Sequence, residues 1–119
     1  MNINYRDSRP IYEQIKDSFK QQILSGIIKK DEKLPSVRDV ATELAINPNT
    51  IQRAYRDLET EGYIYSVAGK GSFAEDSTML RSQMQKDVIA EIKKNLHKLK
   101  NLGIQKENCM DIVKEIFEE

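Results

Sequence analysis

The most constraining feature of this sequence is the stretch from residue 34 to residue 71, in which start and stop signals for two short helices follow closely on one another. Ser36, with Asp39 three residues later, makes a start that resembles a capping box. Asn47 and Pro48 combine a favoured N-cap residue with a favoured first helical residue. The stretch therefore predicts two separate helices rather than one continuous helix.

Apolar residues recur at helical spacing within both predicted helices. The inner face of the first helix comprises Val37, Val40, Ala41 and Leu44. The inner face of the second comprises Ile51, Ala54, Tyr55 and Leu58. Its opposite face is polar and carries Asn49, Thr50, Gln52, Arg53 and Arg56. Gly62 stands where a C′ glycine ends a helix, so the second helix should stop just before it.

A hairpin should follow the second helix. Residues 63–66 and 72–75 are rich in strand-forming side chains, and the glycine-containing residues 67–71 between them favour a turn. Lys33 and Leu34, upstream, could pair briefly with this hairpin as a strand. Two helices and then a hairpin, in this order, predict a winged helix-turn-helix, in which one helix enters a DNA groove.

Three further helices are predicted on either side of this motif. Proline near the start and helically spaced apolar residues indicate a first helix over residues 10–25. Similar spacing indicates a long helix over residues 78–101 and a last helix over residues 106–117. We expect a mainly α fold with a small β-hairpin, divided into a winged helix-turn-helix domain (residues 1–76) and a two-helix dimerisation segment (residues 77–119).

Composition argues against several classes of function. The single cysteine, Cys109, cannot form an internal disulfide, and with the single histidine, His97, it cannot complete a tetrahedral zinc site. No paired carboxylates, activated nucleophile or phosphate loop suggests an enzyme, so we expect no catalysis and no cofactor. No run approaches the roughly 20 apolar residues of a membrane span, and a cytoplasmic protein is expected.

The net charge of zero gives no bulk electrostatic support for nucleic-acid binding. Within the second helix of the motif, however, charge is segregated. Arg53 and Arg56 precede the acidic residues Asp57, Glu59 and Glu61. Any binding to DNA must therefore depend on a few well-placed groups.

The sequence resembles the GntR family of transcriptional regulators, and within it the short YtrA-type subfamily. PIYEQIKDSFKQQILSG matches the family's first helix, KLPSVRDVATEL its second, and INPNTIQRAYRDLETEGYI its recognition helix and the turn into the wing. The resemblance has specific motifs over residues 9–75 and continues to residue 119 by length and helical pattern. It implies a DNA-binding transcriptional regulator, often a repressor of an operon that includes transporter genes.

The resemblance places Ser36 and Arg38 at the start of the positioning helix, where the family contacts DNA. Arg38 would then bind a phosphate or a base edge. Its alternative role is an ion pair with Asp39 or Glu43 on the surface.

On the recognition helix, Asn49 and Thr50 match DNA-contacting positions of the family, although both could simply be polar residues of a first turn. Arg53, one turn further on, could reach a guanine edge or a phosphate, or else form an i,i+4 salt bridge with Asp57. Tyr55 could belong to the core by its spacing, or its hydroxyl could reach a phosphate.

The wing tip is expected at Gly69, Lys70 and Gly71. Small residues there would let the backbone approach the minor groove, with Lys70 supplying charge. A two-glycine turn is also what a tight hairpin requires.

The last two helices each carry an apolar face that a single chain covers only in part, which predicts a homodimer bound to an inverted-repeat operator in double-stranded DNA. The expected dimerisation residues are Leu80, Met84, Val88, Ile92, Leu96, Leu99, Ile112 and Ile116. Cys109 should lie in the apolar face, with a redox sensor as the alternative. Lysines around His97 should face solvent, with DNA-backbone or anionic-effector contact as the alternative. Because the net charge is zero, a protein-interaction module is the second candidate function.

Overall fold

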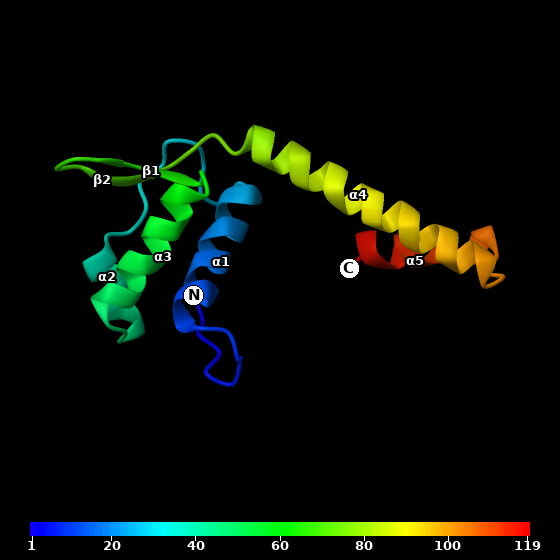
Figure 1. Cartoon of the computed structure of the whole chain (residues 1–119), viewed down its shortest axis with the longest axis horizontal. Coiled ribbons are helices and arrows are strands. Elements are labelled where there is room, and N and C mark those ends of the chain that lie inside the picture. The colour runs from blue at the N-terminus through cyan, green and yellow to red at the C-terminus, as the bar shows by residue number, and fades with distance from the viewer. The chain divides into compact units, whose positions relative to one another are not determined.

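The computed structural model describes residues 1–119 and contains five helices and one two-stranded antiparallel sheet (Figure 1). The elements are α1 (Ile11–Leu24), α2 (Val37–Leu44), α3 (Pro48–Thr60), β1 (Ile64–Val67), β2 (Gly71–Ala74), α4 (Thr78–Asn101) and α5 (Lys106–Phe117). The chain forms two compact units, Met1–Met79 and Leu80–Glu119. The boundary between the units lies within the first turn of α4, three residues beyond the boundary predicted after residue 76. Ser77 is accordingly buried in the first unit.

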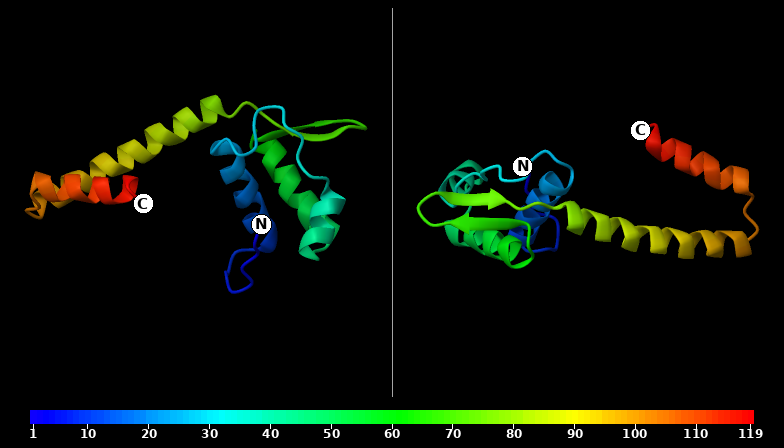
Figure 2. Two further views of the ribbon diagram at one scale, coloured as in Figure 1. Left: turned by 180° about the vertical axis from the view of Figure 1, so that it is seen from behind. Right: turned by 90° about the horizontal axis from the view of Figure 1, so that it is seen from above.

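The first unit is built on a core shared by its three helices, which Figure 2 shows beside the hairpin. Ile15 of α1 and Ile51 and Leu58 of α3 are fully buried. Phe19 meets Tyr55 edge to face, with the two ring centroids 5.4 Å apart, a favoured geometry for aromatic pairs. The mainly helical winged fold predicted from the sequence is confirmed.

The predicted helix caps determine where α2 and α3 begin. The Ser36 hydroxyl accepts a hydrogen bond from the Asp39 amide at 3.0 Å, and the Asn47 side chain accepts one from the Asn49 amide at 2.9 Å. Pro48 occupies the first turn of α3. These bonds satisfy amides that an α-helix leaves free at its start, so each short helix starts at a defined residue.

The end of α3 shifts the start of β1 to Ile64, one residue later than predicted. The Tyr63 amide donates to the Leu58 carbonyl at 2.9 Å, and the Gly62 amide donates to the Glu59 carbonyl at 3.1 Å. This pair of bonds forms a Schellman motif, which requires a left-handed residue at C′, and Gly62 has φ +86°. Tyr63 therefore belongs to the helix terminus rather than to the strand.

The hairpin is widened by a third, short strand-like segment. Backbone hydrogen bonds of 2.8 to 2.9 Å join residues 31–34 to β2, and Lys33 pairs with Phe73 in an antiparallel bridge. The predicted pairing of Lys33 and Leu34 is thus confirmed. A two-stranded hairpin is marginal by itself, and this segment ties its base to the connector that leads into α2.

The second unit consists of α5 and of α4 from Leu80 onward. Both helices have the predicted bounds. Neither helix contains a buried residue, and the two diverge from the turn that joins them (Figure 2). Between them lies an apolar cavity of about 300 Å³, lined by Ile92, Leu96, Leu99, Cys109, Ile112, Val113, Ile116 and Phe117. None of the helices is both long enough and apolar enough to cross a membrane.

Candidate nucleic-acid interface

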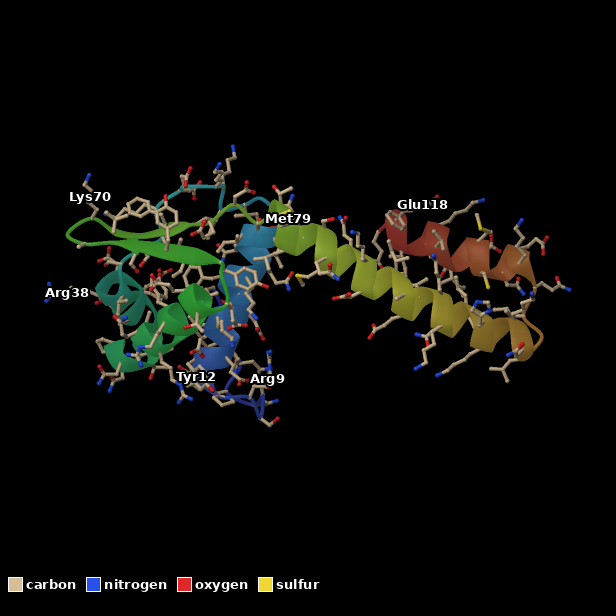
Figure 3. All side chains as sticks on the ribbon, turned by 45° about the horizontal axis from the view of Figure 1, so that its top comes forward. Arg9, Tyr12, Arg38, Lys70, Met79 and Glu118 are labelled. Atoms are coloured by element: carbon tan, nitrogen blue, oxygen red, sulfur yellow. The ribbon has the colours of Figure 1, made fainter.

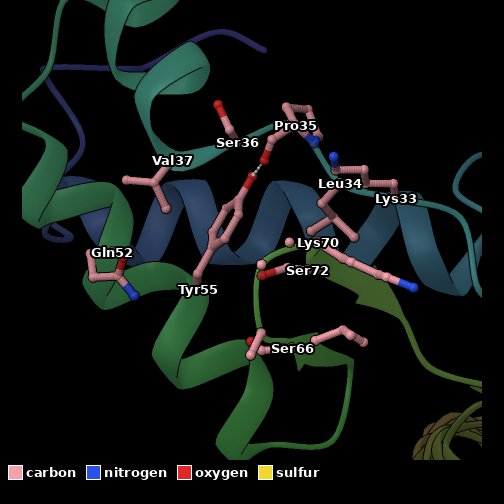
Figure 4. A pocket seen from close by; sticks show the side chains of 14 residues that line it. Lys33, Leu34, Pro35, Ser36, Val37, Gln52, Tyr55, Ser66, Lys70 and Ser72 are labelled. Carbon is pink, nitrogen blue, oxygen red and sulfur yellow. Dashed lines mark hydrogen bonds between the residues drawn. The ribbon is translucent and has the colours of Figure 1, made fainter.

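A hollow of about 460 Å³ opens in the first unit where the start of α2, the side of α3 and the wing meet (Figure 4). Five of the predicted DNA-binding residues line it, namely Ser36, Tyr55, Gly69, Lys70 and Gly71. They come from three segments that are separate in sequence. The fold therefore gathers the positioning helix, the recognition helix and the wing tip around one concave surface.

Arg38 extends from α2 into solvent (Figure 3). Its guanidinium makes no ion pair with Asp39 or Glu43, the acidic residues that offered an alternative role. The arginine is therefore available to an external anion such as a DNA phosphate.

The first turn of α3 presents Asn49 more openly than Thr50. The Asn49 side chain is exposed, and only its backbone amide is engaged, in the N-cap bond. Thr50 is half-buried, and its amide donates to the Asn47 carbonyl at 3.0 Å. Asn49 is thus the better placed of the two to reach a base edge.

Arg53 does not form the salt bridge with Asp57 that its spacing allowed. Its guanidinium carbon lies 3.8 Å from the centroid of the Tyr12 ring on α1, and its Nη2 donates to the Tyr12 hydroxyl at 3.2 Å. Asp57 lies instead 3.9 Å from the Lys16 ammonium. Arg53 remains exposed, at the side of α3 that faces α1.

Tyr55 lies in the core, with 4% of its surface exposed. Its hydroxyl donates to the Pro35 carbonyl at 2.6 Å (Figure 4), and burial raises its pKa well above the ordinary value. Of the two roles considered for Tyr55, core packing and phosphate contact, this environment favours the first. Its ring forms part of the floor of the hollow.

Both glycines of the wing tip have a backbone conformation that other residues rarely adopt. Gly71 has φ +119°, and a Cβ there would lie 3.0 Å from Cε of Lys33. Gly69 also has a positive φ, of +75°, but has open space around it. The Lys70 amide donates to the Val67 carbonyl at 2.9 Å, which closes the turn and leaves the Lys70 side chain extended outward (Figure 3).

Gln52 and Arg56 are two candidate contacts that the sequence analysis placed on the polar face of α3 without including them among the DNA-binding residues. Both are exposed, and Gln52 lines the hollow. With Asn49 they follow steps of three and four residues, which align along one side of a helix. That periodicity is the sequence signal that could have identified them.

Ion pairing in the first unit engages some of its cations and leaves others free. On α1, Lys16 and Lys20 bond to Glu61 at the end of α3, at 3.1 Å and 2.8 Å. Burial raises the pKa of the Glu61 carboxyl, but the two lysines outweigh that effect and hold it below its usual value. Arg9 is paired with Asp7 and Asp17.

The cations around the hollow have no such partners. Lys33, Arg38, Arg56 and Lys70 make no ion pair. The ion pairs of the first unit therefore involve residues on or beside α1 and the end of α3, whereas these four cations lie on α2, on the free side of α3 and on or beside the wing. Unpaired surface cations can attract a polyanion irrespective of the net charge of the chain.

A capped helix-turn-helix beside a glycine-tipped wing, with unpaired cations on α2, α3 and the wing, defines a winged-helix DNA-binding regulator. The family model "Bacterial regulatory proteins, gntR family" matches residues 11–73. The chain belongs to the GntR family.

Similar proteins support this assignment. The chain is 37% identical to the HTH-type transcriptional repressor YtrA of Bacillus subtilis, over 98% of this chain and 91% of YtrA. A transcriptional regulator from Oenococcus oeni has a similar structure, with a TM-score of 0.73 and 30% identity over 98% of this chain and 97% of that one. The DNA-binding domain of AraR in complex with operator ORE1 is similar, with a TM-score of 0.55 and 30% identity, over 61% of this chain and 89% of that one. The protein is therefore a transcriptional regulator with a DNA-binding domain, not an enzyme.

Proposed function

We propose that the protein is a homodimeric repressor that binds an inverted-repeat operator. The observation that carries this proposal is the set of unpaired cations around the hollow formed by α2, α3 and the wing. In each protomer, Arg38, Arg56 and Lys70 would contact the DNA backbone or base edges, with Asn49 and Gln52 facing the bases. Repression is supported by the resemblance to YtrA, which is described as a repressor.

The homodimer is supported by the second unit. Large apolar side chains along α4 and α5 are exposed, including Met84, Val88, Ile92, Leu96, Ile112 and Ile116. Leu80 and Leu99 are half-buried. Monomeric proteins rarely expose large contiguous apolar patches. A two-fold dimer would carry two recognition helices, which accounts for an operator with two half-sites about 34 to 36 Å apart or a multiple of that spacing.

The YtrA-type resemblance further suggests that the regulated operon includes transporter genes. The test is to select bound duplexes from a random pool with the purified protein and to locate the selected sequence upstream of genes in the source genome. An inverted repeat ahead of an operon without transporter genes would contradict only this part of the proposal.

A protein-interaction module is the alternative, favoured by the zero net charge. Salt dependence separates the two functions. A regulator that contacts six or more phosphates should lose about 10³-fold or more in affinity for its selected duplex between 50 and 200 mM salt, because counterions are released on binding. Fluorescence anisotropy titrations across that range measure the slope. Affinity that is indifferent to salt would contradict the proposal.

Arg38→Ala should lower the affinity for the selected duplex by roughly 1 to 3 kcal/mol for each contacting protomer if Arg38 reads a base edge. Lys29→Ala is the matched control, since Lys29 is also an exposed, unpaired cation but lies outside α2, α3 and the wing. Anisotropy titration at one fixed salt concentration measures both variants. Equal losses in the two variants would mean that Arg38 contributes only general charge.

A further inference from the structure

Tyr12, in the first turn of α1, holds an arginine of the recognition helix. The Arg53 guanidinium lies over the Tyr12 ring at 3.8 Å, close enough for a strong cation–π contact. One guanidinium nitrogen, Nη2, donates to the Tyr12 hydroxyl at 3.2 Å. That hydroxyl in turn donates to Oε1 of Glu13 at 3.4 Å. The ring and its hydroxyl therefore restrain both the plane and the rotation of the guanidinium.

This contact leaves most of the binding capacity of Arg53 free. A guanidinium has five N–H donors in a planar fork, and only Nη2 has a partner within the protein. No acidic side chain is hydrogen-bonded to Arg53, because Glu13 bonds to the Tyr12 hydroxyl and Asp57 lies near Lys16. The exposed edge of the fork is suited to bidentate binding of a planar pair of oxygens.

We propose that Tyr12 is a positioning residue that fixes Arg53 to receive a phosphate of the DNA backbone. The inference rests on the DNA binding proposed above. A side chain that reads a base must extend into the groove, but the stack draws Arg53 back against α1, whereas Gln52 lies on the side of α3 that lines the hollow. Since the guanidinium is already ordered, binding a phosphate costs little further side-chain entropy.

A double-mutant cycle tests the coupling. Wild type, Tyr12→Ala, Arg53→Ala and the double variant are titrated with the duplex that the wild-type protein selects from random DNA. Tyr12→Ala should weaken binding about threefold per protomer, and so about tenfold in a dimer, as expected for an exposed cation–π contact. The same substitution should have no effect in the Arg53→Ala background. Tyr12→Phe keeps the ring and should retain most of the affinity.

The salt slope and a base-substitution panel separate a phosphate contact from a base contact. Arg53→Ala should reduce the salt slope by about one per protomer and weaken all duplexes alike, whereas Tyr12→Ala should leave the slope unchanged. A relaxed preference at one base pair would overturn the assignment to phosphate. Tyr5→Ala is the matched control, since Tyr5 is 71% exposed, and thermal unfolding checks that each variant is folded.

Two failures are distinguishable. If the wild-type protein selects no duplex, the proposed function fails and the inference fails with it. In the other failure, the wild type binds while the losses of binding free energy from Tyr12→Ala and Arg53→Ala simply add in the double variant. In that case Tyr12 does not act through Arg53, and only the inference is overturned.

Discussion

Leu96→Glu is expected to convert the protein into a monomer and to lower its affinity for a two-half-site operator by about 10²- to 10⁴-fold, the gain that linked binding sites usually confer. Leu96 lines the apolar cavity between α4 and α5, and 43% of its surface is exposed in the single chain. In the proposed dimer a carboxylate there would be buried without a partner, which costs several kcal/mol. Sedimentation equilibrium measures the association, and anisotropy titration measures the affinity.

Leu102→Glu is the matched control for this prediction. Leu102 is 82% exposed, does not line the cavity and lies just beyond the end of α4. The control should remain dimeric at micromolar concentration and should bind the operator as the wild type does. A dimer that persists in Leu96→Glu would contradict the assignment of this apolar face to the dimer interface.

Tyr55→Ala is expected to lower the free energy of unfolding by about 3 to 5 kcal/mol, as for other large aromatic residues removed from a core. Its ring packs against Phe19, and its hydroxyl donates to the Pro35 carbonyl. Tyr55→Phe keeps the ring and removes only that hydrogen bond, so it should cost about 1 kcal/mol. Urea unfolding followed by circular dichroism measures both losses.

The phenylalanine variant also distinguishes core packing from DNA contact. If Tyr55 only packs, folded Tyr55→Phe binds DNA with the wild-type affinity, and a loss of affinity that exceeds its effect on folding would indicate a phosphate contact instead. Burial raises the pKa of the Tyr55 hydroxyl above its ordinary value of 10.0. The unfolded chain therefore ionises first as pH rises above that value, the wild type loses stability, and Tyr55→Phe should lose less.

The local signals in the sequence were sufficient to predict most helix bounds. Caps at Ser36 and Asn47 act within three residues of themselves, so their effect can be predicted without knowing the fold. The bounds of α4 and α5 follow equally from periodicity. The predicted start of β1 was wrong by one residue. The Schellman motif at Gly62 incorporates Tyr63 into the terminus of α3, and strand propensity alone does not show whether Tyr63 belongs to the helix terminus or to the strand.

Contacts between distant segments could not be predicted in the same way. The pairing of Arg53 with Tyr12 depends on how α1 packs against α3, and the i,i+4 rule instead suggested Asp57. For the same reason, the zero net charge was uninformative about DNA binding. Only the folded structure brings Lys16 and Lys20 to Glu61, and only then does it become clear which cations are neutralised and which remain free.

The absence of any buried residue in α4 and α5 has a consequence for regulation. In the proposed homodimer, α4 and α5 obtain their hydrophobic core from a second copy of the chain. Dimerisation and the ordering of these two helices are then one event. Below the dimerisation constant, the concentration of the operator-binding species rises with the square of the protomer concentration. A doubling of copy number would then raise that species fourfold, which makes expression level itself a steep control over the target genes.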